Sequence, residues 1–423
     1  MEEWKEYELG ELITLNSGGT PDKSNKSYWG GDIPWISAKF MYDDYLYSSE
    51  LKISQEGLDN GSRLAPKGSI LLLTRGSGLF NRIPVCYVMR DLAYNQDVKC
   101  LESKNKELIS TKFLFYWLMG NKNSIGAILE TTGIGAGKID TNRLKNIRIS
   151  LPPKEYQQAL IGFAESIMHK IELNRRINDN LEQQAQALFK AWFVDFEPFR
   201  DGEFVNSVLG STPKELPITY IENIPHNIES GKRPKGGATL IGVPSIGAEN
   251  IKGLGYYDYS KTKYIPEEYA QTIKKGKING YELLIYKDGG KPGYFIPNFT
   301  IFGEGFPFNE MYINEHVFLL DLMDCGYNVF AYFYMQTPYI MNQLNSIGGK
   351  AAIPGINTKD VECLPIYSNE SPYVKKFGEI VLPFIKTILS NSLENAKQAK
   401  VRDTLLPKLM SGELKINEIE TEK

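Results

Sequence analysis

The residues of this chain that could do chemistry form no recognisable catalytic set. The loop that contains Gly137 and Lys138 lacks both the first glycine and the final Ser or Thr of a GxxxxGK[ST] phosphate-binding loop. Glu102 and Lys104 match part of a nuclease carboxylate site, but a lone ExK pair is more often an exposed loop feature. No Asp/Asn-Pro-Pro-Tyr run for amino-group methylation occurs in the sequence. We therefore expect this chain to have no active site of its own.

The spacing of histidine and cysteine argues against a metal site. The three histidines are scattered, and the four cysteines are far apart and form no CxxC pair. The same wide spacing gives no indication of a disulfide framework. These residues are His169, His226 and His316, with Cys86, Cys100, Cys325 and Cys363.

Basic side chains beside glycine-rich turns suggest a binding role instead. Arg75 and Lys287 each follow an apolar strand at a glycine turn, and we interpret them as equivalent positions. Such a side chain can reach base edges or phosphates while the backbone comes close, although an ordinary exposed loop cation fits as well. Lys138 and Lys350 lie in two further glycine-rich loops that we also interpret as equivalent, and we expect phosphate contacts there. The other basic candidates are the turn formed by Lys232, Arg233 and Lys235, and the weaker positions Lys39, Arg63 and Arg82.

The segments that hold these residues occur twice. KGSILLLTRGSG (67–78) resembles NGYELLIYKDGG (279–290), and STKFLFYWLM (110–119) resembles NVFAYFYMQ (328–336). Six ordered matches, among them Ser17-Gly18 with Ser230-Gly231, keep an offset between 212 and 219 residues. The pattern of short strands and turns predicts two tandem β-rich modules, each followed by a long helix.

The first long helix is predicted over residues 152–194. Apolar residues recur there every seven positions, and the polar Asn174 occupies one place in that series. About forty residues at 1.5 Å each give a rod of roughly 60 Å, which needs a partner helix. The apolar series consists of Leu160, Ile167, Leu181 and Leu188.

Residues 373–410 supply the partner helix. Val374, Val381 and Ile388 continue at seven-residue spacing to the polar Asn395. Connectivity requires the two helices to run antiparallel, and Asn174 with Asn395 could fix their register. Pro383 lies inside the second helix, and we expect it to kink the helix or to mark a break near residue 379.

Length, composition and charge limit the class of protein. A chain of 423 residues with 42% hydrophobic and 12% aromatic residues predicts two to four domains with real cores. The acidic N-terminal stretch does not resemble a signal peptide and no apolar run approaches 18 residues, so we expect a cytoplasmic protein. The net charge of −3 argues against nucleic-acid binding unless basic residues are concentrated locally.

Two related modules on a helical spacer suit a ligand with two separated sites. DNA presents equivalent faces about every 34 Å, within reach of modules on such a rod. Modules related by a pseudo-two-fold axis would read half-sites in opposite orientation. The alternative is a protein-interaction scaffold that shares this arrangement without reading DNA.

The segments that follow both modules resemble those of a known family. Residues 151–199 (LPPKEYQQALIGFAESIMHKIELNRRINDNLEQQAQALFKAWFVDFEPF) and 402–414 (RDTLLPKLMSGEL) are similar to the conserved regions of type I restriction-modification specificity (S) subunits. Residues 131–153 resemble the end of the first target recognition domain in that family. The resemblance implies an α/β (α+β) chain with two target recognition domains, 1–151 and 201–367. It also implies two long antiparallel helices, 152–200 and 368–423 with the C-terminal tail.

The resemblance also implies partners and a division of labour. Each recognition domain would read one half of a bipartite DNA target, and the helices would dock two modification (methyltransferase) subunits. Restriction subunits would then join and cleave DNA with ATP. S-adenosylmethionine, ATP and magnesium are expected on these partner subunits, and no cofactor is expected on this chain. A fused methyltransferase is argued against by the missing motifs.

An aromatic cluster at the end of the first helix has two interpretations. Trp192, Phe193 and Phe196 could contact a methyltransferase subunit, or they could pack against the adjacent module. Trp192 lies on the seam line of the helix, which favours packing for that residue. The sequence does not separate the two interpretations for the other aromatic residues.

Overall fold

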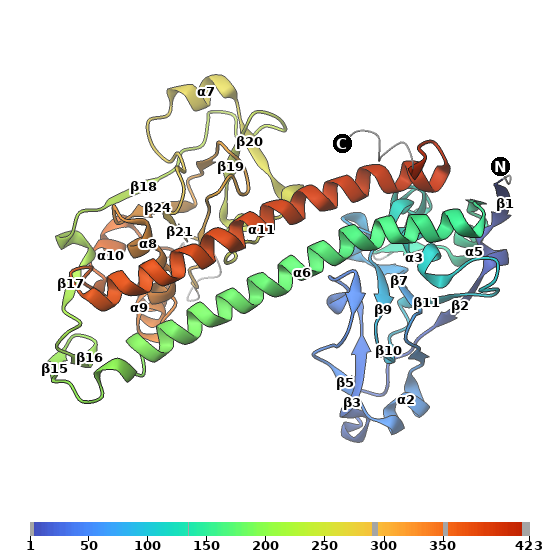
Figure 1. Cartoon of the computed structure of the whole chain (residues 1–423), viewed down its shortest axis with the longest axis horizontal. Helices are drawn as coiled ribbons and strands as arrows, with labels where there is room; N and C mark the ends of the chain where they lie inside the picture. Colours follow the sequence, from blue (N-terminus) through green and yellow to red (C-terminus); the bar gives the residue numbers. More distant parts are fainter. Residues whose placement is uncertain (1–3, 134, 290–294, 350–353, 417–423) are drawn as a thin grey trace. The chain divides into compact units, whose positions relative to one another are not determined.

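The computed structural model describes residues 4–133, 135–289, 295–349 and 354–416 (Figure 1). The chain divides into two compact units: unit 1 comprises residues 1–169 and 398–423, and unit 2 comprises residues 170–397. Two forty-residue helices, α6 (Lys154–Phe193) and α11 (Pro372–Ser411), each contribute to both units. Each unit therefore combines one β-rich module with part of both long helices, and the prediction of two long helices is confirmed.

The module of unit 1 is built around a five-stranded sheet of order β2-β11-β7-β9-β4. A four-stranded sheet (β5-β3-β10-β6), a three-stranded sheet (β12-β13-β8) and the pair β1-β14 complete it. Its strands are β1 Lys5–Glu8, β2 Ile13–Ser17, β3 Trp29–Ile36, β4 Tyr45–Leu46, β5 Lys52–Ile53, β6 Leu64–Ala65, β7 Ile70–Leu73, β8 Arg75–Gly76, β9 Val85–Val88, β10 Leu92–Tyr94, β11 Val98–Ser103, β12 Leu129–Thr131, β13 Gly137–Ile139 and β14 Arg148–Leu151. Its short helices are α1 Leu9–Leu12, α2 Gln55–Gly61, α3 Thr111–Gly120, α4 Lys122–Gly126 and α5 Thr141–Lys145.

The core of unit 1 is closed by an apolar helix. Residues 113–119 of α3 are all buried, as expected for a helix that is hydrophobic on every side. The Ser110 hydroxyl caps α3 by accepting a hydrogen bond from the Phe113 N–H. Leu160 from α6 and Leu409 from α11 join the same core, so the long helices are part of this unit.

Unit 2 repeats this construction with a four-stranded sheet of order β18-β24-β21-β22 and a three-stranded sheet of order β20-β19-β23. The helix α8 is buried as α3 is, and Asp324 caps it by accepting from the Tyr327 N–H. The strands are β15 Phe204–Ser207, β16 Gly210–Pro213, β17 Ile218–Tyr220, β18 Asn227–Ser230, β19 Val243–Ile246, β20 Lys263–Ile265, β21 Leu283–Tyr286, β22 Phe299–Ile301, β23 Tyr312–Ile313, β24 Val317–Asp321 and β25 Pro365–Tyr367. The helices are α7 Glu267–Thr272, α8 Cys325–Met335, α9 Pro338–Gly348 and α10 Thr358–Glu362.

Strand register confirms the internal repeat residue by residue. In unit 1, Lys99 of β11 lies opposite Ser17 of β2 and Leu72 of β7. In unit 2, Phe318 of β24 lies opposite Ser230 of β18 and Ile285 of β21. The parallel pairs β3-β10 and β19-β23 also correspond. This register defines which residues are counterparts, and it is used in that sense below.

The two long helices run antiparallel in each unit. In unit 2, the Asn174 Nδ2 of α6 donates to the Asn395 Oδ1 of α11 at 3.0 Å, and the Phe189 and Phe377 rings lie 5.7 Å apart. Residues later on α6 therefore meet residues earlier on α11. The same direction holds in unit 1, where Met168 contacts Arg402. The predicted antiparallel pairing and the contact between the two seam asparagines are both confirmed.

The expected break near residue 379 is wrong, whereas the alternative, a kink at Pro383, stays a prediction. Helix α11 continues from Pro372 to Ser411 without interruption. Proline removes one backbone donor from a helix, and Pro383 is exposed, so water can satisfy the carbonyl that loses its partner. Buried Val381 and Ile385 hold the helix on the unit 2 core on either side of the proline.

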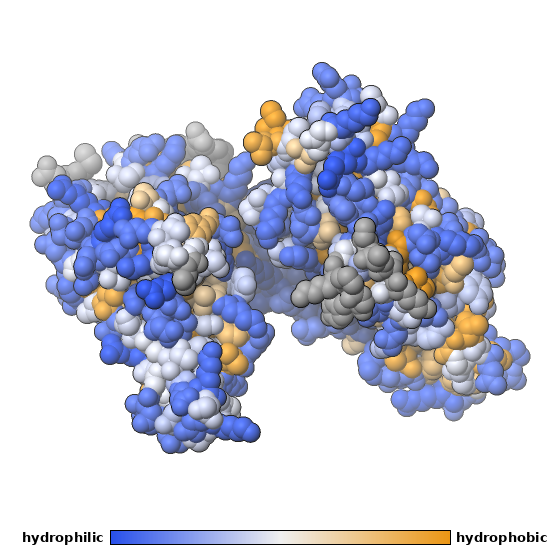
Figure 2. All heavy atoms as spheres, turned by 180° about the vertical axis from the view of Figure 1, so that it is seen from behind, coloured by the Kyte–Doolittle hydropathy of each residue, from blue (hydrophilic) through white to orange (hydrophobic). Residues whose placement is uncertain are grey.

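The surface is mainly polar. On the face drawn in Figure 2, hydrophilic residues dominate and apolar residues form small separate groups. No helix in the described part of the chain has the length and apolar character needed to cross a membrane.

Candidate nucleic-acid interface

In unit 1, three basic residues gather beside the turn that follows β2. The Lys99 Nζ donates to the Ser17 Oγ at 2.6 Å and to the Gln96 carbonyl at 3.2 Å. Burial lowers the pKa of Lys99; the Asp97 carboxylate opposes this shift, and nearby Arg75 adds to it. Arg75 is therefore close enough to Lys99 for the two charges to repel each other.

Arg75 and Lys138, two of the predicted contacts, lie directly opposite each other. They are cross-strand partners in the antiparallel pair β8-β13. Like charges at such positions are destabilising, although Glu130 lies opposite Lys138 on its other side. Arg75 is exposed and Lys138 is half-buried. The pair forms a local positive site in a chain of net charge −3, and an anion would relieve its repulsion.

The counterparts in unit 2 differ from those predicted. The backbone N–H of Ile139 donates to the Thr74 carbonyl, and the N–H of Ile356 donates to that of Lys287. Together with the register of β21 and β24, this makes Lys287 the counterpart of Thr74. The predicted equivalence of Arg75 and Lys287 is therefore wrong by one residue.

The counterpart of Arg75 is an acidic residue. Asp288 follows Lys287 and bridges Gly355, just as Arg75 pairs with Lys138. Gly355 is thus the counterpart of Lys138, whereas we predicted that Lys350 would be that counterpart. Lys350 itself lies outside the described residues.

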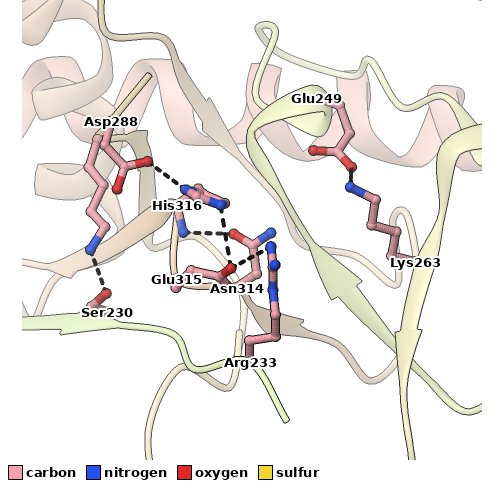
Figure 3. Close-up of polar contacts among 9 residues, drawn as sticks. Ser230, Arg233, Glu249, Lys263, Asp288, Asn314, Glu315 and His316 are labelled. Carbon is pink, nitrogen blue, oxygen red and sulfur yellow. Dashed lines mark hydrogen bonds and ion pairs between the residues drawn. The ribbon is translucent and has the colours of Figure 1, made fainter. Parts of the chain in front are cut away.

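Unit 2 has a chain of polar contacts between acidic and basic side chains at this position (Figure 3). The His316 Nδ1 lies 2.6 Å from the Asp288 Oδ1, and its Nε2 lies 3.4 Å from the Glu315 Oε1. The same Glu315 oxygen is 2.5 Å from the Arg233 guanidinium. Beside this chain, the Lys287 Nζ donates to the Ser230 Oγ at 2.9 Å and lies 4.7 Å from the centre of the Phe318 ring.

The two modules place different chemistry on the same framework. The Thr20 hydroxyl donates to the Gln96 Oε1 at 2.7 Å in unit 1, and its counterpart is the ion pair of Arg233 and Glu315. A loop framework that is kept while its polar side chains change is suited to reading different ligands.

A second contact is reversed in charge. Lys39 lies 3.7 Å from Glu50, and both side chains are well exposed. Glu249, the counterpart of Lys39 on the short helix after β19, lies 2.7 Å from Lys263. The two modules therefore carry an ion pair of opposite polarity at this position.

The other predicted basic residues differ in how far hydrogen bonds within the chain already hold their side chains. Lys232 and Lys235 are exposed. Arg63 donates to the Asn16 Oδ1 at 3.0 Å. Arg82 is held by the backbone carbonyls of Met41 and Tyr42. Sequence reasoning missed Lys99 and His316; β11 reads VKCLES, with Glu102 and Ser103 besides Lys99, so its pattern does not single out the lysine.

The aromatic cluster at the end of α6 divides into a core residue and two half-buried ones. Phe193 is 4% exposed and lies 4.9 Å from Phe330 and 5.6 Å from Phe377, ring centre to ring centre. Phe193 is therefore a core residue of unit 2 and its assignment to partner binding is wrong. Trp192 and Phe196 are half-buried, and partner binding by these two stays a prediction.

The described residues contain no group of three or more His, Cys, Asp or Glu side chains that could hold a metal ion. The polar clusters of both modules are instead built from cations, amides and paired carboxylates. Such clusters can bind a polar, anionic partner through hydrogen bonds and electrostatic attraction.

Comparisons with known proteins agree with this geometry. Residues 1–183 match the family described as the type I restriction modification DNA specificity domain. Over 99% of this chain and 95% of the relative, the sequence is 27% identical to the type I restriction enzyme MjaIX specificity subunit of Methanocaldococcus jannaschii. It is 25% identical to the HindI specificity subunit of Haemophilus influenzae, over 98% of this chain and all of that protein.

A solved structure shares the fold. The S subunit of a type I restriction-modification system from M. genitalium superposes with a TM-score of 0.54 over 96% of both chains, at 17% identity. At this identity the likeness bears on the fold alone. The match of residues 1–183 and the two relatives of nearly equal length make the chain similar to type I restriction-modification specificity subunits.

Proposed function

We propose that the chain reads a bipartite DNA target, with one half-site bound by the β-rich module of each unit. The observation that carries this proposal is the repeated polar framework beside the turns at Ser17 and Ser230, on which the side chains differ between modules. A shared framework with changed donors and acceptors gives two readers of related geometry and different sequence preference.

The helices α6 and α11 set the spacing between the two half-sites in this proposal. Asn174 is 1% exposed and bonds to both Glu394 and Asn395, which fixes one register of the pair. A fixed register gives a fixed number of base pairs between the half-sites. The same helices offer their remaining faces to two methyltransferase subunits, with Trp192 and Phe196 as candidate contacts.

The chain acts within a complex. Restriction subunits that cleave DNA with ATP complete that complex in our proposal. S-adenosylmethionine, ATP and magnesium are bound by the partner subunits and not by this chain.

The proposal is tested by expressing the chain with a methyltransferase subunit in a host without other DNA methylation, followed by sequencing of the methylated genome. We expect one motif with two specified halves and an unspecified spacer. A scaffold without a DNA-reading role would copurify with its partner and give no such motif. A methylated motif with a single uninterrupted half would contradict the assignment of one half-site to each module.

A further inference from the structure

In each module, a lysine ammonium donates to the serine that ends the first strand of the main sheet. The two serines are counterparts, but the two lysines come from different strands. In unit 1 it is Lys99 of β11, whose Nζ donates to Ser17 at 2.6 Å. In unit 2 it is Lys287, which follows β21 and donates to Ser230 at 2.9 Å. The counterpart of Lys99 is Phe318, and the counterpart of Lys287 is Thr74. Both positions have therefore changed residue type, while the ammonium on the serine is present in both modules.

The serine turns are fixed in place. Each serine is followed by a glycine that presses against a backbone carbonyl of the neighbouring segment. An added Cβ would lie 2.1 Å from the Tyr94 oxygen at Gly18 and 1.9 Å from the Ile313 oxygen at Gly231. The serine hydroxyl, and the ammonium bound to it, are thus held at a defined point of each module.

Neither ammonium bonds to a carboxylate within the described part of the chain, although the charge of Asp97 acts on Lys99. Neither Lys99 nor Lys287 takes part in an ion pair there, and their described acceptors are hydroxyl and carbonyl oxygens. A partly buried cation that is bonded only to neutral oxygens retains its attraction for an external anion.

We propose that this ammonium is a DNA phosphate contact common to both modules, whereas the residues around it read bases. The inference rests on the proposed function and assigns a role within it. The surrounding positions differ in chemistry between the modules, as Thr20 and Arg233 illustrate, whereas the ammonium is common to both. A phosphate is present at every step of DNA, so a contact to it is the one that both modules can share.

The test uses the chain assembled with its methyltransferase subunits and a duplex that carries its own methylated motif. Affinity is measured over a range of salt concentrations for Lys99→Gln, Lys287→Gln and the double variant. We expect the slope of log K against log salt to fall by about 0.9 for each lysine removed. Affinity for the motif and for an unrelated duplex should fall by the same factor, and the methylated motif should not change.

Two kinds of control variant keep the result interpretable. Lys99→Arg retains the charge and should retain the slope, which separates loss of the contact from loss of the fold. Lys214→Gln removes an exposed lysine that is paired with Glu203 at 2.6 Å in the β15-β16 hairpin, and it should leave the slope unchanged.

Three outcomes would overturn the inference in distinguishable ways. An unchanged salt slope in the double variant would show that these ammonium groups do not meet phosphate. An altered motif in either single variant would make that lysine a base reader. Failure of the unsubstituted complex to bind any duplex would overturn the proposed DNA-reading function together with this inference.

Discussion

Arg75 and Asp288 occupy the same position in the two modules and carry opposite charge. Arginine donates two hydrogen bonds to guanine, whereas a carboxylate accepts from the cytosine amino group. Under the proposed function, the same backbone position can therefore favour different bases in the two half-sites. Each residue also has its own local setting, with Lys138 opposite Arg75 and His316 beside Asp288.

Replacing Arg75 by Ala should relax the motif in one half-site and leave the other half unchanged. A lost bidentate base contact costs about 1–3 kcal/mol of discrimination. The matched variant Asp288→Ala should relax the other half-site. Sequencing of methylated sites for the two variants checks this, and a change in both halves from either variant would argue against independent modules.

Arg402 anchors the end of α11 to the module of unit 1. Its side chain is 11% exposed, and the guanidinium lies 3.1 Å from the Asp44 carboxylate. The nearby carboxylates of Asp403 and Asp44 raise the pKa of Arg402 despite its burial. Arg402→Met should lower the free energy of unfolding by about 3 kcal/mol, because Asp44 stays behind without its partner.

Urea unfolding of the purified chain measures this loss, and two further variants interpret it. Asp44→Asn in the Arg402→Met background should recover part of the stability, since it removes the unpaired charge. Lys39→Met breaks the exposed pair with Glu50 and should cost less than about 1 kcal/mol. Equal losses for Arg402→Met and Lys39→Met would contradict the anchoring role.

The sequence predicted that basic residues lie near the glycine turns of both modules. It was less successful in predicting which residue of one module is the counterpart of which residue in the other. Similarity of LLLTRG and LLIYKDG aligned the two cations Arg75 and Lys287, but cross-strand register sets the counterparts, and a shift of one residue exchanges the faces of a strand. Lys99 lies beside Ser17 because β11 pairs with β2, and no local pattern reveals that pairing. One of the six repeat matches, Asn142 with Asn357, is also wrong, because the residues that cap α5 and α10 are Asp140 and Asn357.

At the scale of elements, the helices were predicted well because their signal is long and periodic. The seam positions Leu160, Ile167 and Asn174 are all buried. The break expected near residue 379 does not occur, because the local rule for proline leaves out the tertiary context. An exposed proline loses one hydrogen bond, whereas the buried residues on both sides keep the helix continuous.

The polar seam between α6 and α11 gives stability that depends on pH. A hydrogen bond from Asn174, together with the Lys170 ammonium at 3.2 Å, holds the pKa of Glu394 below its ordinary value of 4.5. The ionised carboxylate thus stabilises the folded chain fully above pH 4.5, and this contribution is lost as the pH falls through the lower folded pKa. Replacing Glu394 by Gln removes this contribution.

The urea midpoint of the unsubstituted chain should therefore exceed that of Glu394→Gln above pH 4.5, and the two should converge at lower pH. Glu413→Gln is the control, because Glu413 lies 3.5 Å from Lys408 in an exposed ion pair. Its urea midpoint should stay close to that of the unsubstituted chain at every pH. A constant difference between the unsubstituted chain and Glu394→Gln down to the acid limit would show that the ionisation of Glu394 does not contribute.

At the scale of the whole molecule, the proposed function requires two modules, and each module packs on segments of the same helix pair. Leu160 of α6 and Leu409 of α11 belong to the core of unit 1, whereas Phe189 and Phe377 of the same helices belong to that of unit 2. The modules therefore cannot be uncoupled from the helices that join them. The net charge of −3 is compatible with DNA binding only through local positive sites such as that of Arg75, Lys99 and Lys138.

The proposed spacing role predicts the effect of a matched deletion. Residues 169–175 and 394–400 face each other through Asn174 and Glu394, and neither segment contributes to the described core of either module. Removing both segments deletes seven residues from each helix and leaves the flanking pairs in register. At 1.5 Å per residue the helix pair shortens by about 10 Å. This equals roughly three base pairs at 3.4 Å each, so the unspecified spacer of the methylated motif should lose about three base pairs.

Removing only residues 169–175 places the two helices out of register and should abolish methylation, which distinguishes matched length from simple damage. If the matched deletion keeps both half-site sequences and shortens the spacer, the modules still read their half-sites and only the spacing has changed. That result would assign base reading to the modules and spacing to the helices. A spacer of unchanged length after the matched deletion would show that the helix pair does not set the distance. In that case the spacing would have to come from the methyltransferase subunits, because no other segment of the described chain contributes to both units.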